Sequence, residues 1–398
     1  MKRVLSLYTG AGGLDFGVEA AGFETAVALE FDKAACRSLR ANRTWPVIEA
    51  DIHSTTSKQI LQSGGLKTGD ADLLIGGPPC QPFSKSGYWA RGDSLRLDDP
   101  RADTINAYLR VLRDTQPRTF LLENVPGIAY KGKMEALDRI LAGLEQINRE
   151  TGSNYSASWQ IVSAADYGVP QMRERFVMVG SRDGSDFEFP KPTHGHEAQP
   201  HHTTWDALGD LPSAPNEPNL AMGGKWADLL PTIPEGQNYL WHTDRGGGSP
   251  LFGWRRRYWS FLLKLAKDRP SWTIQAQPGS ATGPFHWSNR KLSSRELCRL
   301  QTFPDDVAIE GSRQDIQRLI GNAVPSPLAE VIGREIDKQL LGGKKTGRKL
   351  KLEPPFRGKP PTPEKPLKLP AKFRELIGDH EAHPGDGLGY AAQRRNVA

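Results

Sequence analysis

The sequence of 398 residues lacks the marks of several broad protein classes. It contains only three cysteines, which lie too far apart for a disulfide framework or a C-x-x-C metal pair. No run of about 18 apolar residues occurs, which excludes a membrane-spanning helix. The apolar stretch at the N-terminus is too short for a signal peptide and predicts a first strand instead. We therefore expect a protein of the reducing cytoplasm that has no membrane partner.

The sequence has an excess of positive charge only at its C-terminal end. The net charge is +6, but residues 343–398 hold 13 Lys and Arg against 6 Asp and Glu, and the remainder carries −1. The basic balance therefore does not by itself indicate that the folded body binds nucleic acid. This tail is rich in proline and lysine, which predicts a mostly disordered segment. The alternative is that residues 373–377 form a short helix that docks on the body.

Residues 1–186 alternate short apolar runs with longer amphipathic ones. This alternation predicts an α/β fold with a mostly parallel sheet covered by helices. Functional groups should then gather at the carboxyl ends of the strands. The predicted strands are 4–8, 25–30, 47–49, 72–75, 119–122, 159–163 and 175–180, and the predicted helices are 14–21, 33–41, 102–114 and 134–150.

From about residue 187 the chain becomes rich in proline and tryptophan, which predicts a smaller, loop-rich second domain over 187–311. Helical patterns return at 293–301 and 326–341. Four histidines cluster within 194–202, but no cysteine lies nearby and solvated loop histidines explain them. We expect no metal site.

One thiol stands on a stiff turn. Segment 76–84 reads Gly-Gly-Pro-Pro-Cys-Gln-Pro-Phe-Ser and follows a short apolar run, so Cys80 would lie at the carboxyl end of a buried strand. Prolines on both sides restrict the backbone there. The same residues would also suit a buried structural cysteine.

Candidate functional residues follow two further predicted strands. Segment 7–14, Leu-Tyr-Thr-Gly-Ala-Gly-Gly-Leu, leads from the first strand into a helix, where glycines let a ligand approach the backbone. Glu30 follows about 20 residues later, at a place where an acidic residue commonly binds ribose hydroxyls. A dinucleotide fingerprint needs glycine where this chain has Asp15, which favours an adenosine ligand without a pyrophosphate. Glu123 ends another apolar strand, where burial would raise its pKa and let it hold a proton.

Five blocks in this order resemble the C5-cytosine DNA methyltransferases, and the resemblance covers residues 1–341. It implies a Rossmann-like S-adenosylmethionine-dependent methyltransferase domain over 1–186, completed by 312–342, with 187–311 as the target recognition domain. The enzyme would methylate C5 of a flipped-out cytosine in a specific double-stranded DNA sequence, through a covalent adduct with Cys80. The blocks are Pro-Pro-Cys-Gln, Glu-Asn-Val, Gln-x-Arg-x-Arg, Arg-Glu-x-x-Arg-Leu-Gln-x-Phe-Pro and Gly-Asn-Ala-Val-Pro.

The resemblance also implies a role for individual residues. Cys80 would be the nucleophile, Glu123 would act on cytosine N3, Arg175 would bond the base at O2 and Arg173 would support the active-site loop. The S-adenosylmethionine pocket would be lined by Tyr8, Gly10, Ala11, Gly13, Glu30, Phe31, Asp51, Ile52, Gly77, Pro79, Asn322 and Ala323. Tyr8 and Thr104 depart from the family, which usually has phenylalanine and often leucine at these positions.

Three other functions compete. A tRNA cytosine-5 methyltransferase of the same fold usually carries a Cys-Phe-Thr run, which this chain lacks. An inactive regulator would lose the nucleophile or the cofactor glycines, which this chain keeps. An NAD-dependent enzyme is opposed by Asp15. Because no chromatin-reading or zinc module is evident, we expect a monomeric prokaryotic or phage enzyme, with any cognate restriction endonuclease acting separately.

Overall fold

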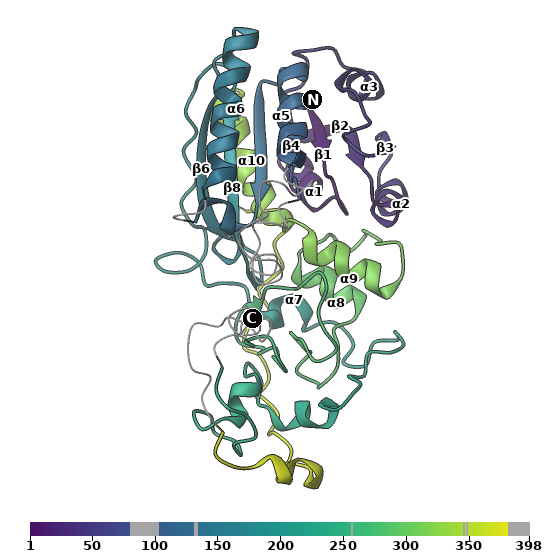
Figure 1. The fold of residues 1–398 in the computed structure, drawn as a ribbon, viewed down its shortest axis with the longest axis vertical. Helices are drawn as coiled ribbons and strands as arrows, with labels where there is room; N and C mark the ends of the chain where they lie inside the picture. Colours follow the sequence, from purple (N-terminus) through teal and green to yellow (C-terminus); the bar gives the residue numbers. More distant parts are fainter. Residues whose placement is uncertain (80–102, 131–133, 256–257, 345–346, 348, 381–398) are drawn as a thin grey trace, which may run out of the picture.

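A seven-stranded sheet occupies the upper half of the molecule in Figure 1. The computed structural model describes residues 1–79, 103–130, 134–255, 258–344, 347 and 349–380, and all structural statements refer to these. The strands stand in the order β3-β2-β1-β4-β5-β8-β6. Their bounds are β1 Lys2–Leu7, β2 Phe23–Glu30, β3 Val47–Glu49, β4 Leu73–Gly76, β5 Thr119–Asn124, β6 Ser156–Ser163 and β8 Glu174–Ser181.

The predicted mostly parallel sheet is confirmed. Neighbouring strands from β3 to β5 pair in parallel, and only β8 runs antiparallel to both of its neighbours, β5 and β6. The chain builds outward from β1 to β3 and then returns to place β4 on the other side of β1. The carboxyl ends of β1 and β4 therefore flank the switch point, where α/β proteins bind ligands.

Helices cover both faces of the sheet because side chains of successive strand residues point to opposite faces. One face packs on α3 (Ser57–Ser63), α5 (Asp103–Thr115) and α6 (Glu135–Thr151). The other face packs on α1 (Gly13–Ala20) and α10 (Ser326–Leu340). Within the described chain, no helix has the length and apolar character needed to cross a membrane.

The lower half contains little regular structure, as its prolines predict (Figure 1). A two-stranded sheet joins β7 (Gln171–Met172) to β9 (Ser271–Trp272). The sequence reading missed α3, α7 and α9, which are short or follow no strong apolar pattern. The remaining helices are α2 Lys33–Asn42, α7 Thr204–Leu208, α8 Ser294–Leu300 and α9 Arg313–Asn322, with 3₁₀ helices η4 Pro126–Ala129, η5 Ala164–Tyr167, η6 Ala227–Thr232 and η7 Tyr239–His242.

Helices α8 and α9 share one apolar cluster with the N-terminal segment. Leu297 of α8 and Leu319 of α9 are buried in the same cluster as Ala11, Phe16 and Ala34. The expected boundary at residue 311 therefore lies within a shared core, and the division into domains stays a proposal.

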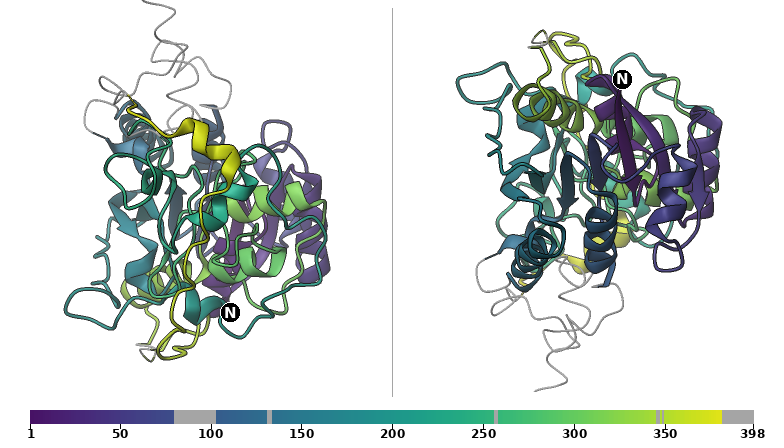
Figure 2. Two further views of the ribbon diagram at one scale, coloured as in Figure 1. Left: turned by 90° about the horizontal axis from the view of Figure 1, so that it is seen from below. Right: turned by 90° about the horizontal axis from the view of Figure 1, so that it is seen from above.

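The prediction of a disordered tail is wrong for residues 349–380, which we call the C-terminal strap. The strap leaves the sheet half and crosses the loop-rich half, as Figure 2 (left) shows in yellow. Leu350 is buried beside α10, and Phe373 is buried in the second half. The alternative of a docked short helix is confirmed by the 3₁₀ helix η8 (Ala371–Leu376). The composition predicted disorder because an average over the segment hides the few apolar side chains that pack against the body.

Polar contacts fix the strap along its length. The backbone N–H groups of Lys351 and Leu352 donate to the fully buried carboxylate of Glu330. Further along, the Arg357 N–H donates to Asp206 at 2.7 Å, and the Leu367 N–H donates to the Pro231 carbonyl at 3.0 Å. The strap thus connects the two halves of the molecule.

We expect Phe373→Ala to lower the free energy of unfolding by about 3–5 kcal/mol, because the ring leaves a cavity beside Trp226. Leu367→Ala is the matched control, since that strap side chain is 66% exposed and should change stability by less than about 0.5 kcal/mol. Urea unfolding of both variants measures the difference. Equal small effects would contradict the docking of η8.

Candidate active site

The loop between β1 and α1 lies at the switch point and is shaped by glycine. Gly10 has a φ of 56°, and a Cβ added there would meet no atom of the described residues within 4 Å, so these residues leave the space above the loop open. Gly13 serves a different purpose, because an added Cβ would lie 2.3 Å from the Val324 carbonyl oxygen. Gly13 therefore permits the close approach of the C-terminal segment, while Gly10 faces the open space. Ala11, between them, is buried.

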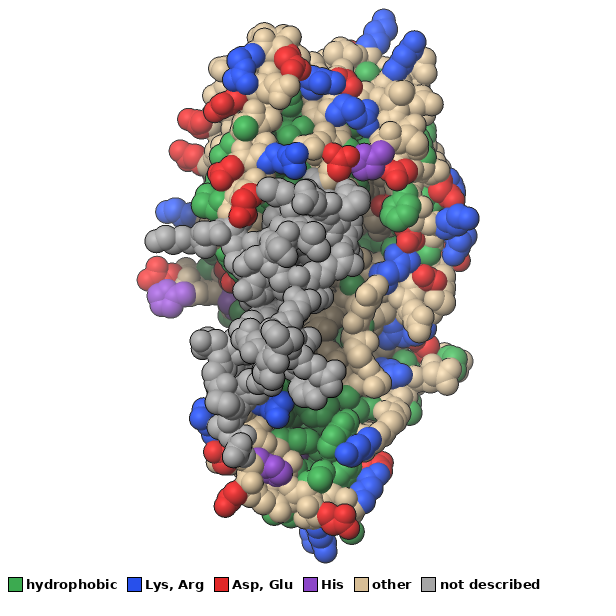
Figure 3. Space-filling view, viewed as in Figure 1, with side chains coloured by type: hydrophobic (Ala, Val, Ile, Leu, Met, Phe, Trp, Pro, Cys, Tyr) green, Lys and Arg blue, Asp and Glu red, His purple; other side chains and the backbone are tan. Residues whose placement is uncertain are grey.

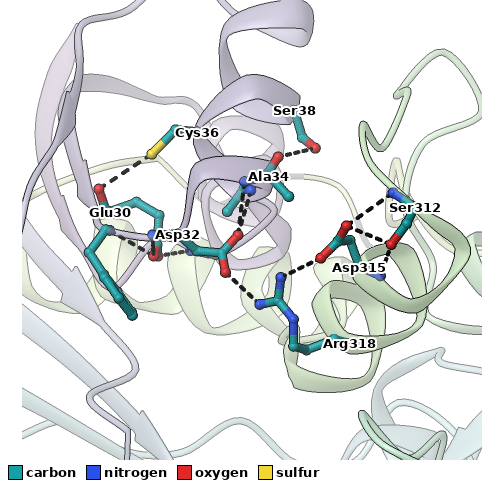
Figure 4. A network of polar contacts seen from close by, with 11 residues as sticks. Glu30, Asp32, Ala34, Cys36, Ser38, Ser312, Asp315 and Arg318 are labelled. Carbon is teal, nitrogen blue, oxygen red and sulfur yellow. Dashed lines mark hydrogen bonds and ion pairs between the residues drawn. The ribbon is translucent and has the colours of Figure 1, made fainter.

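Glu30 joins this loop to the end of β2. Its carboxylate accepts hydrogen bonds from the N–H groups of Gly10 at 2.7 Å and of Phe31 and Asp32 at 2.8 Å. Figure 4 shows Glu30 beside Asp32. Burial raises the pKa of Glu30, and the three N–H donors oppose that shift. The carboxylate thus fixes two loops at the mouth of the switch point.

Asp32 connects the same region to α9, as Figure 4 shows. It accepts hydrogen bonds from Ala34 and Ala35 at the start of α2, and it forms an ion pair with Arg318 at 2.6 Å. Arg318 also pairs with Asp315 at 3.0 Å. The sequence reading missed Arg318, because nothing in its local pattern indicates a partner almost 300 residues away.

The residues expected around an adenine ring gather at this edge of the sheet. The Phe31 ring is 71% exposed and Ile52 is buried, while Asp51 is exposed and accepts the His53 N–H at 2.9 Å. The Tyr8 hydroxyl donates to the Thr104 carbonyl at 2.7 Å, and burial raises its pKa. An exposed apolar ring beside a buried carboxylate suits a ligand with an aromatic part and hydroxyl groups.

The turn before the cysteine is held at both prolines. The Asn124 side chain donates to the Pro78 carbonyl at 3.1 Å, and the Thr104 hydroxyl donates to the Pro79 carbonyl at 3.1 Å. Cys80 itself lies outside the described residues. The turn nevertheless fixes where segment 76–84 starts, at the carboxyl end of β4.

Glu123 and Arg175 form a buried ion pair beside this turn. Arg175 Nε lies 2.7 Å from Glu123 Oε1, and each side chain is 11% exposed. A Cβ added at Gly77 would lie 2.9 Å from Glu123 Oε2, so the glycine makes room for the carboxylate. Burial raises the pKa of Glu123, and the guanidinium groups of Arg175 and Arg173 oppose the rise. The carboxyl group is therefore placed where it could bind a proton.

Arg173 acts on backbone groups. Its fully buried guanidinium donates to the carbonyls of Ile274 at 3.3 Å, Gly321 at 2.6 Å and Ala323 at 3.1 Å. It thereby positions the end of α9, where Asn322 is exposed. Arg173 thus makes the contacts expected of a residue that positions other groups.

Three of the sequence blocks meet in the same network. The Gln171 side chain donates to the Gln301 side chain at 2.7 Å, and Gln301 donates to the Ala323 carbonyl at 2.5 Å. Gln171 also accepts the Ile274 N–H at 3.1 Å. The Gln-x-Arg, Leu-Gln and Gly-Asn-Ala blocks are thus bonded to one another, although each looks unremarkable alone.

We expect Arg173→Met to reduce the free energy of unfolding by about 3 kcal/mol or more, because the carbonyls of Ile274 and Gly321 lose this donor, while Ala323 keeps the donor from Gln301. Arg149→Met is the control, since that side chain is 71% exposed. Denaturant titration compares the two. A loss at Arg173 no larger than at Arg149 would show that the network is not needed for folding.

Comparison with known proteins gives a consistent picture. The family model described as "C-5 cytosine-specific DNA methylase" matches residues 2–338. The Type II methyltransferase M.SacI of Streptomyces achromogenes is 41% identical, with 85% of this chain and 93% of that protein aligned. The Type II methyltransferase M.NgoFVII of Neisseria gonorrhoeae is 34% identical over 81% of this chain and 83% of that protein.

Solved structures share the fold. A putative DNA modification methyltransferase encoded in an Escherichia coli prophage superimposes with a TM-score of 0.61 at 23% identity, covering 86% of this chain and all of that one. Spodoptera frugiperda DNMT2 gives a TM-score of 0.60 at 15% identity, covering 84% of this chain and 99% of that one. At these identities the likeness concerns the fold.

Proposed function

The chain belongs to the C-5 cytosine-specific DNA methylase family of Type II methyltransferases, and we propose that Cys80, Glu123 and Arg175 carry its reaction on a flipped-out cytosine of duplex DNA. One observation carries this proposal. The buried Glu123–Arg175 pair lies beside Gly77, three residues before the Cys80 thiol. The Type II relatives favour DNA over tRNA as the substrate.

Cys80 is the thiol best suited to be a nucleophile. The other two thiols, Cys36 and Cys298, are buried, and burial raises the pKa of each to about 12. Both would stay protonated at neutral pH, whereas a nucleophile must form a thiolate. Only Cys80 also follows a strand end at the switch point.

The reaction activates a carbon that is otherwise unreactive. The Cys80 thiolate would form a bond to C6, and the electron pair of the C5–C6 double bond would move toward N3 and O2, which leaves C5 nucleophilic. A proton on Glu123 would stabilise the charge at N3, and the Arg175 guanidinium would stabilise it at O2. After methylation, loss of the C5 proton would restore the double bond and expel the Cys80 thiolate.

The residues of the switch point fit S-adenosylmethionine, which supplies the electrophilic methyl group when it is bound. The open space over Gly10 and the exposed Phe31 ring would accept the ligand. Glu30 would accept the ribose hydroxyls and Asp51 the adenine amino group. The other lining residues would be Tyr8, Ala11, Ile52, Gly77, Pro79, Asn322 and Ala323, with Gly13 acting through loop packing.

We propose that residues 187–311 read the DNA sequence. Base flipping is needed because the duplex hides C6 in the stack. Trp259 and Trp272 are 47% and 40% exposed, and their ring centroids lie 5.5 Å apart. Figure 3 shows acidic and basic side chains mixed on the upper half of one face, and exposed hydrophobic side chains on the lower half.

We also propose a monomeric enzyme whose cognate endonuclease, where there is one, acts separately.

We expect Cys80→Ser to abolish methylation, because a serine hydroxyl does not ionise at neutral pH. Bisulfite sequencing of DNA from expressing cells measures both activity and target sequence, and Cys298→Ser is the control. A duplex with 5-fluorocytosine at the target should trap the wild type covalently. An adduct formed by Cys80→Ser would show that another nucleophile acts.

We expect Glu123→Gln to reduce turnover by about 10²-fold or more while S-adenosylmethionine binding is retained, because it removes a positioned acid–base group. Glu30→Ala should show the opposite pattern, a large loss of binding. Equilibrium binding and saturating-substrate kinetics on both variants separate these effects. Equal losses of affinity would contradict the assignment.

A further inference from the structure

Two buried histidines and a strap carboxylate converge away from the proposed active site. His194 is 2% exposed and His202 is 1% exposed, and both precede α7. Glu353 comes from the C-terminal strap. A ring nitrogen of each histidine and a carboxylate oxygen of Glu353 all lie within 4.8 Å of one another.

Three of the four histidine ring nitrogens lack hydrogen-bond partners within the described chain. His194 Nδ1 lies 2.9 Å from the Thr193 hydroxyl, but His194 Nε2 has no hydrogen-bond partner. Neither ring nitrogen of His202 has one. Because buried polar atoms are nearly always paired, unpaired nitrogens on two neighbouring rings point to a missing ligand that takes one nitrogen from each ring.

The surroundings support these rings in a state able to donate lone pairs. Burial lowers the pKa of both His202 and His194. The Phe356 ring stacks on His202 with centroids 4.1 Å apart and covers the group. Asp206 Oδ2 lies 3.9 Å from His202 Nδ1, which is too long for a hydrogen bond.

We propose that His194, His202 and Glu353 bind one divalent transition-metal ion of the zinc class. Two imidazoles and one carboxylate form a ligand set that zinc accepts, with a water in the fourth position. Imidazole ligands disfavour magnesium and calcium, which prefer oxygen. This proposal replaces the expectation of no metal site, which rested on the absence of a nearby cysteine. The missing ligand comes from residue 353, about 150 residues further along the chain.

The ion would fasten the strap to the body. His194 and His202 belong to the segment that leads out of β8, while Glu353 belongs to the strap between its anchors at Glu330 and Asp206. Loss of the ion would therefore loosen the strap at this point. The site lies outside the proposed catalytic residues, so its test does not depend on them.

The test uses the full-length protein, stripped with a chelator and titrated with Co²⁺ and then Zn²⁺. We expect one Co²⁺ per chain with visible d–d absorption, displacement by Zn²⁺, and a higher melting temperature with Zn²⁺. Glu353→Gln and His194→Gln should weaken binding by about 10²-fold or more. His196→Gln is the matched control, because that side chain is 94% exposed and lies outside the cluster.

Zinc X-ray absorption on the wild type provides a measurement that does not depend on the folding of any variant. Nitrogen and oxygen ligands with the signature of two imidazoles are expected. Sulfur ligands, binding below one equivalent, or equal affinity in Glu353→Gln and His196→Gln would overturn the proposal. An unchanged melting temperature with Zn²⁺ would do so as well.

Discussion

The close approach of helix α1 to the segment that begins α10 is the constraint on which the rest of the structure depends. A Cβ at Gly13 would meet the Val324 carbonyl at 2.3 Å, and one at Gly17 would meet the Ala329 Cβ at 2.3 Å. The Ser326 hydroxyl also donates to the Gly13 carbonyl at 2.9 Å. Only glycine allows backbones to approach so closely. Helices α1 and α10, which are more than 300 residues apart in the sequence, thereby pack together and cover one face of the sheet.

This contact makes the ligand-facing loop a product of both chain ends. At Gly10 the described residues leave open space, whereas at Gly13, three residues later, the Val324 carbonyl fills the place of a Cβ. Two glycines of one motif thus serve different purposes, one leaving room for a ligand and the other allowing close packing. The same holds for the arginines of the Gln-x-Arg-x-Arg block. Arg173 holds backbone carbonyls and Arg175 faces Glu123, because Arg173 lies between β7 and β8 whereas Arg175 lies within β8.

Local pattern predicted the seven strands of the sheet and most of its helices, since apolar periodicity reflects which face is buried. It also placed Glu30 and Glu123 at strand ends. It could not predict Arg318 beside Asp32, or Glu353 beside two histidines, because these pairings arise from the path of the whole chain. The strap was misjudged for a related reason. Two buried side chains, Leu350 and Phe373, hold a segment whose average composition resembles that of a flexible tail.

The Glu123–Arg175 pair sets the energetic problem of the proposed reaction. Burial raises the pKa of the carboxyl group, and the adjacent guanidinium opposes that rise, so the two groups stabilise each other while no base is bound. A cytosine entering between them would offer N3 to the carboxyl group and O2 to the guanidinium. Glu123 would have to bind a proton in order to donate to N3, so its negative charge would be neutralised, and the Arg175 guanidinium would exchange the carboxylate for O2. Neither group would then remain as a buried unpaired charge, which would cost several kcal/mol. The pair thus keeps both groups satisfied and positioned before the substrate arrives, and Gly77 provides the space that this arrangement requires.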